Sequence, residues 1–364
     1  MKIALSGYYG FDNAGDEALL SAITSSILRL RPDAKFVVFS GAPAKTAAQH
    51  GIEAVHYMSP WQVWRGLRSA DLLISGGGSI FQDVTSARSL AYYISVVALA
   101  KLLGKPVIFY AQGVGPINRA ASKWLMRLVG NQVDIITLRD EASSRLLQEL
   151  GVRKPPLIVT ADPVFALVPG PAAERKIASL LRQKGFNGQP LVGVAVRNWP
   201  ALEGYQPRLA RILDDLAERG YRIVFVPMAY PDDVSEARRV AALMDAEALV
   251  LDESLKSQEH LALIANMQLM IAMRLHALIF AANRGVPFAG ISYDPKVEAF
   301  LSSFNMAPLP ADYAAMLRQV EVLLDDPHAG EEIRMRAQYM RSRSEENARL
   351  ALSLLPAQRG GAHE

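Results

Sequence analysis

The chain has 364 residues and a formal net charge of +3, and its residues are 51% hydrophobic and 21% charged. This length is too great for one ordinary hydrophobic core and favours two domains, while the composition is that of a globular rather than a disordered protein. The absence of cysteine excludes a disulfide framework, a thiolate nucleophile and any cysteine-based zinc or iron–sulfur site.

The first residues and the distribution of charge limit where in the cell the protein is expected and which partners it is expected to bind. The apolar stretch after Lys2 is too short for the core of a signal peptide, and no apolar run approaches the roughly 18 residues that span a bilayer. We therefore expect a cytoplasmic protein. The 39 basic residues are interleaved with 36 acidic ones and form no long block, so nucleic acid is not an expected partner. The small positive excess suits an anionic substrate or membrane surface, and an ordinary solvated surface explains it equally well.

The first 160 residues alternate short apolar runs with amphipathic stretches. Strands are expected at Lys2–Ser6, Lys35–Phe39, Asp71–Ser75, Pro106–Ala111, Asp134–Leu138 and Leu157–Thr160. Helices are expected between several of them, at Glu17–Leu30, Ser89–Leu103 and Glu141–Leu150. Because buried parallel strands are continuous apolar runs joined by helical crossovers, this alternation predicts βαβ units.

A second series of the same kind follows a break. The stretch from Phe165 to Ala173 is rich in proline and glycine and is typical of a linker. Beyond it, strands are expected at Leu191–Val196, Arg222–Val226, Ala248–Leu251, Leu269–Ala272 and Phe288–Ile291. Helices are expected at Arg175–Lys184, Pro207–Arg219, Val234–Met244, Glu259–Asn266 and His276–Asn283. The sequence thus predicts two α/β domains, at residues 1–167 and 174–330.

The last segment, residues 331–364, is expected to be a long polar helix from about Glu331 to Leu355, followed by a frayed end with the sequence AQRGGAHE. Nothing in this segment decides whether the helix crosses back onto the first domain. No repeat of about 20–50 residues is visible, which excludes a solenoid.

The loop after the first strand reads GYYGFDNAGDEALL. Loops at this position matter because open parallel sheets bind ligands beyond the carboxyl ends of their strands. Asn13 or Asp16 can cap the helix that follows, and the three glycines favour contact with a ligand, although a capped helix start explains the same residues. The loop is neither the G-x-G-x-x-G dinucleotide fingerprint nor a P-loop, since no Gly-Lys-Ser/Thr occurs.

Two further loops and an arginine follow later strands of the first half. Gly76–Gly78 open the loop GGGSIFQD, where bare backbone lets a substrate approach and offers unshielded N–H groups; a flexible turn is the alternative. The loop AQGVGP offers Gln112 as a polar contact. Arg139 ends a strand in TLRDE, and it needs either an acidic partner, such as Asp140 or Glu141, or an anionic ligand.

Basic residues gather after three strands of the second half. Arg197 ends one of these strands, and Lys296 follows the last strand in ISYDPKV. Arg274 and His276 leave another buried strand and open a helix, and on an extended segment their side chains point the same way. Because Arg, His and Lys are costly to hold together without an anion, this cluster favours a phosphate or carboxylate site over a histidine with a purely structural role.

Metal and hydrolase motifs are missing from the sequence. The six histidines form no i, i+4 pair and no H-E-x-x-H motif, and no G-x-S-x-G occurs. We therefore expect an enzyme without a metal or a cofactor, although a magnesium site made only of carboxylates stays open.

Six motifs together resemble the polysaccharide pyruvyl transferase family. They are YYGFDNAGDEALL, ISGGGSIFQD, AQGVGP, TLRDE, MRLHALIFA and ISYDPKV, which occur in that family's order and at similar intervals over roughly residues 1–300. MRLHALIFA followed by YDPKV is the most telling part. The resemblance implies a GT-B-like fold, in which two Rossmann-like domains face a cleft that holds the active site and a C-terminal helix returns to the first domain.

The resemblance also implies an activity. Family members transfer a pyruvyl group from phosphoenolpyruvate to a sugar, often as a 4,6-linked cyclic ketal, and release phosphate. The members that look most similar act in cell-wall polymer synthesis, on lipid-diphosphate-linked sugars such as N-acetylmannosaminyl disaccharides.

By matching motifs, the resemblance assigns roles to residues. His276 would be the general acid/base, and Arg139, Arg274 and Lys296 would be ligands of the anionic donor. Arg197 lies outside the six motifs, and its place at a strand end makes it a further candidate for donor binding. The acceptor would lie against Asn13, Asp16, Glu17, Gly76, Gly77, Gly78 and Gln112. The first domain would thus hold the acceptor and contribute Arg139, while the second would hold the donor.

Two other functions stay open: a sugar-nucleotide glycosyltransferase of the same architecture, and a non-catalytic glycan- or anion-binding module. A nicotinamide-dependent oxidoreductase is disfavoured because the dinucleotide fingerprint is missing.

A lipid-linked acceptor would place the enzyme at the inner face of the membrane. Trp61–Arg68 and Ser122–Leu128 combine aromatic and basic residues as interfacial segments do, but ordinary helices that bury their tryptophans explain both segments better. A homo-oligomer is neither indicated nor excluded.

Overall fold

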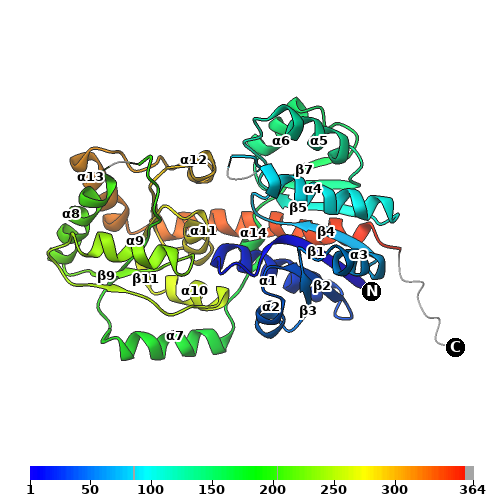
Figure 1. Cartoon of the computed structure of the whole chain (residues 1–364). Helices are drawn as coiled ribbons and strands as arrows, with labels where there is room; N and C mark the ends of the chain where they lie inside the picture. The colour runs from blue at the N-terminus through cyan, green and yellow to red at the C-terminus, as the bar shows by residue number, and fades with distance from the viewer. Residues whose placement is uncertain (85–86, 203, 357–364) are drawn as a thin grey trace. The chain divides into compact units, whose positions relative to one another are not determined.

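The structure, a computed structural model, describes residues 1–84, 87–202 and 204–356. The chain divides into two compact units, each with its own parallel sheet (Figure 1). Unit 1 comprises Met1–Phe11, Leu19–Ala166 and Met340–Glu364, and unit 2 comprises Asp12–Ala18 and Leu167–Tyr339.

Unit 1 is built on a seven-stranded parallel sheet in the order β3-β2-β1-β4-β5-β6-β7. The strands are β1 (Lys2–Tyr9), β2 (Lys35–Ser40), β3 (Glu53–His56), β4 (Leu72–Gly76), β5 (Val107–Gln112), β6 (Ile135–Leu138) and β7 (Leu157–Val159). The central strands are buried apolar runs, as parallel strands covered on both faces must be. The strand order reverses between β1 and β4, so the loops after these two strands flank the switch point where such sheets bind ligands.

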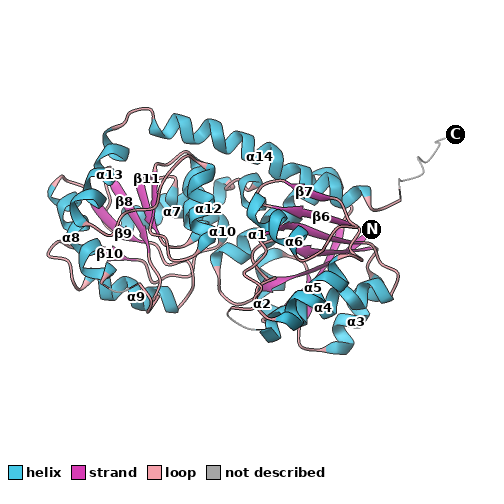
Figure 2. Ribbon diagram, turned by 90° about the horizontal axis from the view of Figure 1, so that it is seen from above, coloured by secondary structure: helices cyan, strands magenta, loops and turns pink. Residues whose placement is uncertain are grey.

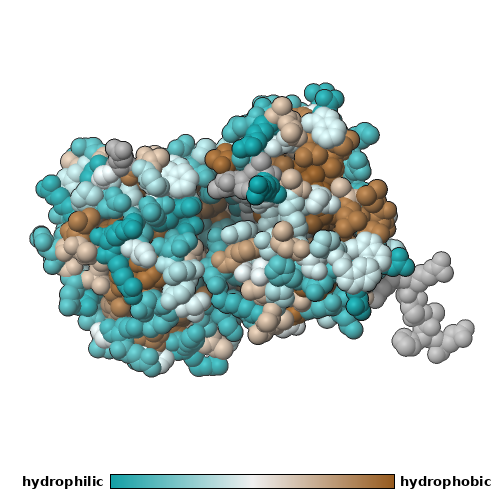
Figure 3. Space-filling view, in the orientation of Figure 1, coloured by the Kyte–Doolittle hydropathy of each residue, from teal (hydrophilic) through white to brown (hydrophobic). Residues whose placement is uncertain are grey.

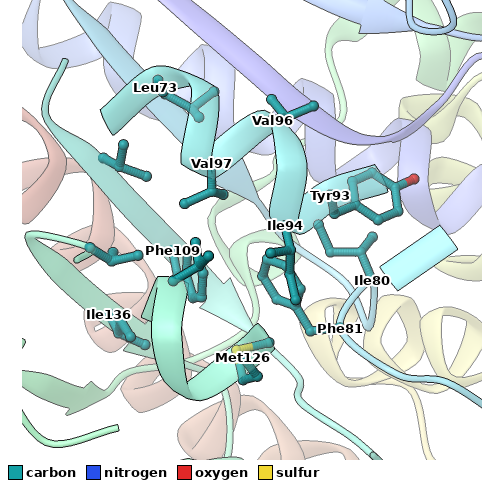
Figure 4. Close-up of a cluster of buried hydrophobic side chains, with 14 of the residues drawn as sticks. Leu73, Ile80, Phe81, Tyr93, Ile94, Val96, Val97, Phe109, Met126 and Ile136 are labelled. Atoms are coloured by element: carbon teal, nitrogen blue, oxygen red, sulfur yellow. The ribbon is translucent and has the colours of Figure 1, made fainter. Parts of the chain in front are cut away.

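Helices cover both faces of the unit 1 sheet. They are α1 (Ala14–Leu30), α2 (Pro43–His50), α3 (Pro60–Ser69), α4 (Ala87–Leu102), α5 (Ala120–Gly130), α6 (Glu141–Glu149) and the C-terminal part of α14 (Ala329–Ser353). One core packs α3, α4 and α5 against the sheet, around side chains such as Phe81 and Phe109, whose ring centres are 4.5 Å apart (Figure 4). The opposite core packs α1 and α14 through residues such as Ile23 and Ala348.

Unit 2 holds a five-stranded parallel sheet in the order β10-β9-β8-β11-β12. Its strands are β8 (Leu191–Ala195), β9 (Arg222–Phe225), β10 (Ala248–Val250), β11 (Met267–Ala272) and β12 (Phe288–Gly290). Its helices are α7 (Pro171–Gln183), α8 (Tyr205–Glu218), α9 (Asp232–Ala241), α10 (Ser257–Ile264), α11 (Leu275–Arg284), α12 (Pro295–Ser303) and α13 (Tyr313–Asp325). Residues of α8, α9 and α13, such as Leu213 and Val320, form a core with the sheet. Figure 2 shows the strands of each sheet lying between helices.

A short segment between β1 and the body of α1 belongs to unit 2. Ala14 N–H donates to Met228 O at 2.8 Å, and Asn13 forms a β-bridge with Ala229. Asn13 Oδ1 accepts the Gly15 N–H at 3.0 Å, which is the bond of a helix N-cap. Of the two residues expected to cap this helix, Asn13 is therefore the one that does so.

The fold class expected from the sequence is confirmed, with two α/β units that each contain a parallel, Rossmann-like sheet. The sequence did not predict β3, because its four residues are only partly buried and contain no apolar run. The expected linker is ordered at both ends, since Phe165 is buried in a 3₁₀ helix (Pro163–Ala166) and α7 begins at Pro171. The expected frayed end, residues 357–364, lies outside the described residues.

Two tryptophans that were expected to be buried are exposed. Trp61 of α3 is 65% exposed and Trp124 of α5 is 62% exposed. These helices bury other residues against the sheet, such as Val63 and Met126, so the tryptophans fall on the solvent side. The expectation of buried tryptophans is therefore wrong at these two positions.

Every helix in the described part of the chain is too short or too polar to pass through a bilayer.

We expect acidification to weaken unit 2 through His260. Burial lowers the pKa of this imidazole below its usual value of 6.5, although the carbonyls of Pro227 and Lys256 raise the pKa in part. Well above pH 6.5 His260 is neutral in both states. As the pH falls through 6.5, the unfolded chain binds a proton at His260 more readily than the folded chain does. The free energy of unfolding should therefore fall below about pH 6.5, more steeply than in His260→Gln. Urea unfolding on both sides of that pH measures this difference, and equal pH dependences would contradict it.

Candidate active site

Three adjacent strand ends in unit 2 carry the basic residues expected from the sequence. Arg197 lies two residues after β8, Arg274 lies two residues after β11, and Lys296 follows β12 as the second residue of α12. Because β11 pairs in parallel with both β8 and β12, these three strands end at the same edge of the sheet. The fold thus brings the three cations to the edge where open parallel sheets bind ligands.

Arg274 is held by a buried carboxylate. Its Nε donates to Asp233 Oδ2 at 2.9 Å, and its Nη2 donates to Asp233 Oδ1. Asp233 is 1% exposed and also accepts the backbone N–H groups of Met228 and Ala229. This two-pronged bond fixes the plane of the guanidinium and offsets its charge. Nη1 of Arg274 has no hydrogen-bond partner among the described residues, so this nitrogen is available to a ligand.

Arg197 differs from the other cations, because in the described part of the chain no carboxylate pairs with it. Its Nη1 donates to Tyr293 Oη at 3.1 Å, and its guanidinium carbon lies 5.0 Å from the centre of the Trp199 ring and 5.1 Å from that of Tyr293. Its Nε is buried and has no hydrogen-bond partner there. Since aromatic faces compensate a cation only in part, Arg197 is the cation best suited to bind an anion.

Tyr293 links Arg197 to Lys296. Lys296 Nζ lies 5.9 Å from the centre of the Tyr293 ring and 3.1 Å from Asp294 Oδ2. The Asp294 side chain also accepts the backbone N–H of Lys296 and so caps α12. The motif ISYDPKV contains Tyr293, but sequence reasoning gives it no role, because only the fold brings the ends of β8 and β12 together.

His276 lies in the first turn of α11 and contacts the start of α1. A Cβ atom on Gly15 would fall 2.0 Å from His276 Nδ1, so only glycine fits at this position. Asn13 and Gly15, which were expected near a ligand, therefore lie beside the expected acid/base within unit 2. The sequence predicted an extended segment from Arg274 to His276, with both side chains on one side, and this prediction is wrong. Because α11 begins at Leu275, strand alternation does not align the two side chains.

Arg139 directly follows β6, at the carboxyl end of that strand of unit 1. Its Nη1 pairs with Asp162 Oδ2 at 3.1 Å, and its Nη2 donates to Ser79 Oγ at 2.8 Å. The guanidinium lies against Gly113, where a Cβ would come within 2.7 Å of Nε. The expected partner Asp140 is farther away, at 3.8 Å, because its side chain caps α6. Sequence reasoning missed Asp162, which follows β7 and makes Arg139 a compensated, nearly buried cation.

The triple glycine that begins with the last residue of β4 has a role in packing. A Cβ on Gly76 would lie 2.9 Å from Ile23, and a Cβ on Gly77 would lie 3.0 Å from Leu19, so α1 packs directly against this loop. The N–H of Gly77 donates to a carbonyl of β5, so the unshielded donor expected at this glycine is already used. Gly78 has a φ of +79°, a backbone conformation that favours glycine.

The remaining candidates for acceptor binding are a buried amide and two carboxylates. Gln112 is fully buried, and its Nε2 donates to Ser75 O at 3.0 Å, which ties β5 to β4. Its Oε1 has no hydrogen-bond partner among the residues described. Asp16 and Glu17 lie in the first turn of α1, where negative charge stabilises a helix. Contact between an acceptor and these three side chains stays a prediction.

The candidate site consists of cations and an imidazole rather than metal ligands. Within residues 1–84, 87–202 and 204–356, no three His, Asp or Glu side chains are arranged to hold a metal ion. Two surface hollows lie away from the site, one of about 760 Å³ beside β3 and α3 and one of about 370 Å³ beside α13. Three cations at adjacent strand ends, with a histidine on the helix that follows one of them, suit a small and multiply charged anion.

Two sequence comparisons relate the chain to known proteins. A model of the polysaccharide pyruvyl transferase family matches residues 13–295. The amylovoran biosynthesis protein AmsJ of Erwinia amylovora is 25% identical in an alignment of 275 residues that covers 69% of this chain. The match covers 63% of AmsJ, so the chain spans less than two thirds of that relative's length.

Solved structures of the same architecture have low sequence identity. Alr3699/HepE of Anabaena, in complex with UDP-glucose, aligns with a TM-score of 0.62 and 14% identity over 97% of this chain and 98% of that one. The UDP-GlcNAc 2-epimerase of Neisseria meningitidis, bound to UDP-GlcNAc, aligns with a TM-score of 0.63 and 11% identity over 97% of this chain and 99% of that one. These likenesses concern the fold alone, and they show that it is GT-B-like.

Gly15→Ala should displace the imidazole of His276. The new methyl group would overlap the ring, and relief of the overlap should cost about 1–3 kcal/mol of stability. The imidazole signals in a long-range ¹H–¹⁵N spectrum measure the displacement, and comparison with His276→Gln assigns the signal. Gly170→Ala is a matched control, because this glycine also has a negative φ beside a helix start and its Cβ would meet Gln258 Oε1 at 3.4 Å. An unshifted His276 signal in Gly15→Ala would contradict the close approach.

Proposed function

The chain belongs to the polysaccharide pyruvyl transferase family, and on this premise we propose that it transfers a pyruvyl group from phosphoenolpyruvate to a sugar and releases phosphate. The family match over residues 13–295 carries the proposal, because it encloses Arg139, Arg197, Arg274 and His276. The relative AmsJ, named for amylovoran biosynthesis, supports a role in the synthesis of a polysaccharide.

The donor matches the cations at the strand ends of unit 2. Phosphoenolpyruvate carries a carboxylate and a phosphate, so it needs several positive groups around it. Arg197 offers a charge that no carboxylate offsets among the described residues, and Arg274 offers a nitrogen that Asp233 holds in a fixed position. Such preorganised donors stabilise developing negative charge without reorganisation. Lys296 completes this set, and Arg139 is the candidate donor ligand from unit 1.

The proposed reaction adds two sugar hydroxyls to one carbon of the donor. Protonation of the methylene carbon gives an oxocarbenium-like centre at C2, which the first hydroxyl attacks. The second hydroxyl then displaces phosphate from C2 and closes the cyclic ketal, and its proton leaves with the phosphate. His276 serves as general base toward the hydroxyls and general acid toward the methylene carbon and the departing phosphate.

We propose a sugar with free 4- and 6-hydroxyls as the acceptor, of the N-acetylmannosamine type and part of a lipid-diphosphate-linked precursor of a cell-wall polymer. Asp16 and Glu17 would repel a diphosphate but can accept hydrogen bonds from hydroxyls. The segment from Asn13 to Glu17 therefore suits the sugar, and its contact with His276 through Gly15 supports that assignment. Gly76–Gly78 and Gln112 are the candidates from unit 1 for the rest of the acceptor.

A sugar-nucleotide glycosyltransferase is the second candidate function. The fold likeness to Alr3699/HepE, which was solved with UDP-glucose, favours it. The same strand-end cations are able to bind a nucleotide diphosphate, since a fold by itself does not determine function. A glycan- or anion-binding protein without catalysis is the third candidate.

Donor binding and product analysis separate the first two candidates. We expect titration calorimetry to show binding of phosphoenolpyruvate that UDP-glucose does not displace. With hexose glycosides that carry free 4- and 6-hydroxyls, we expect one phosphate released per pyruvyl ketal formed, with the mass gain of that ketal in the sugar product. Release of UDP from UDP-glucose, without phosphate from phosphoenolpyruvate, would support the glycosyltransferase instead.

His276→Ala should abolish turnover while leaving donor binding largely intact. Loss of a general acid/base costs about 10²–10⁴-fold in kcat, whereas the cations that bind the donor are unchanged. His328→Ala, at an exposed histidine of the same unit, is the matched control and should keep full activity. Turnover that survives in His276→Ala would rule out the acid/base role. A wild type that binds phosphoenolpyruvate but never turns over would identify a binding protein.

A further inference from the structure

Three adjacent helices of unit 1 carry basic residues and no acidic ones. α3, α4 and α5 cover one face of the sheet, and their inner sides share one core. Their sequences are PWQVWRGLRS, ARSLAYYISVVALAKL and AASKWLMRLVG, without a single Asp or Glu. Their basic residues are Arg65, Arg68, Arg88, Lys101, Lys123 and Arg127. The outer side of these three helices is called the α3–α5 face below.

The positive charge of the α3–α5 face is little compensated. Lys101 pairs with Asp134, with 2.7 Å between Nζ and Oδ2. The other five basic side chains are exposed, and none of them forms an ion pair within the described parts of the chain. Acidic residues account for 36 of the 364 residues in the whole chain. Their complete absence from three neighbouring helices therefore distinguishes this face from the rest of the chain.

Large apolar side chains protrude from the same face. The exposed members are Met58, which lies two residues before α3, and Trp61, Leu102, Trp124 and Leu128, with exposed fractions between 47% and 84%. Trp61 stacks on Trp64 with ring centres 4.9 Å apart, and the Arg68 guanidinium lies 5.5 Å from the Trp64 ring centre. Figure 3 shows apolar and pale aromatic surface gathered over α3, α4 and α5. This surface is amphipathic, with aromatic, aliphatic and cationic groups side by side.

Such a combination matches the boundary between water and lipid. Tryptophan is favoured at the level of the headgroups, because its ring is apolar and its indole N–H can still donate a hydrogen bond. Arginine and lysine near the surface are attracted to anionic lipids. A second copy of this chain is a less suitable partner for this face. If two such faces met, their positive charges would lie opposite one another and repel.

We propose that the α3–α5 face docks on the surface of an anionic phospholipid bilayer. Trp61, Trp124 and Leu128 enter the headgroup region, while Arg65 and Lys123 contact lipid phosphates. The proposal concerns unit 1 alone and does not depend on the reaction proposed above. It predicts reversible, salt-sensitive binding of the full chain to membranes.

Sedimentation with vesicles tests the apolar part. The wild type should bind vesicles of phosphatidylcholine with phosphatidylglycerol at low salt, and it should bind pure phosphatidylcholine vesicles at least tenfold more weakly. Trp61→Ser with Trp124→Ser should weaken binding at least tenfold, whereas Tyr339→Ser, at a residue that is 62% exposed on α14, should not. Because all three side chains are exposed, thermal unfolding should show that each variant folds.

Charge removal tests the electrostatic part. Arg65→Gln with Lys123→Gln should weaken binding to the anionic vesicles about 25-fold, on the basis of about fivefold for each basic residue near the surface. Arg175→Gln with Arg182→Gln, at exposed positions of α7, is the matched control and should bind like the wild type. Thermal unfolding should show that these two variants also fold.

Tryptophan fluorescence adds a direct measure of depth. Three of the four tryptophans, at positions 61, 64 and 124, belong to the α3–α5 face, so brominated lipids should quench most of the emission. Equal binding to neutral and anionic vesicles, no binding to either, or no effect of the tryptophan substitutions would overturn the proposal. A wild type that is dimeric in solution and becomes monomeric on tryptophan substitution would instead assign the face to contact between copies.

Discussion

Positive charge buried at the ends of strands has to be compensated, and this requirement decides the surroundings of the candidate arginines in each unit. Arg139 and Arg274 each turn to a buried carboxylate, Asp162 and Asp233 respectively. Arg197 has the rings of Trp199 and Tyr293 in place of a carboxylate, and rings offset less of a cation's charge. The two kinds of environment give the arginines different capacities: the paired ones are fixed in position, and Arg197 keeps the larger share of its charge for a ligand.

Much of the fold and the placement of the cations could be predicted from the sequence. Continuous apolar runs mark the central strands, and in a parallel sheet whatever follows a strand lies at one edge, which locates Arg197, Arg274 and Lys296. Their partners could not be predicted. Asp233 is 41 residues from Arg274, and Tyr293 is 96 residues from Arg197. Such pairs depend on the order of strands in the sheet, which no local pattern encodes.

Prediction also failed where one local pattern has two physical causes. A glycine after a strand suits a bound ligand as well as a tightly packed neighbour, and at Gly15 the structure shows the neighbour, His276. A tryptophan in α3 or α5 could lie on either the buried or the exposed side of an amphipathic helix. Which side is buried depends on where the sheet lies relative to the helix. β3 lacks the apolar run that reveals the other strands, because it lies at the edge of the sheet and is only partly buried.

The two units are interleaved along the chain, and this has a consequence for biosynthesis. A core of unit 1 includes Ala348 and Ala351, and Asn347 accepts a hydrogen bond from Thr160 at 2.8 Å. Since the ribosome adds residues from the N-terminus onward, the unit that is begun first is completed last, after all of unit 2 has been synthesised. Until then this side of its sheet is covered by α1 but not by the C-terminal part of α14, so apolar residues of the nascent chain stay open to aggregation and to chaperones through most of translation.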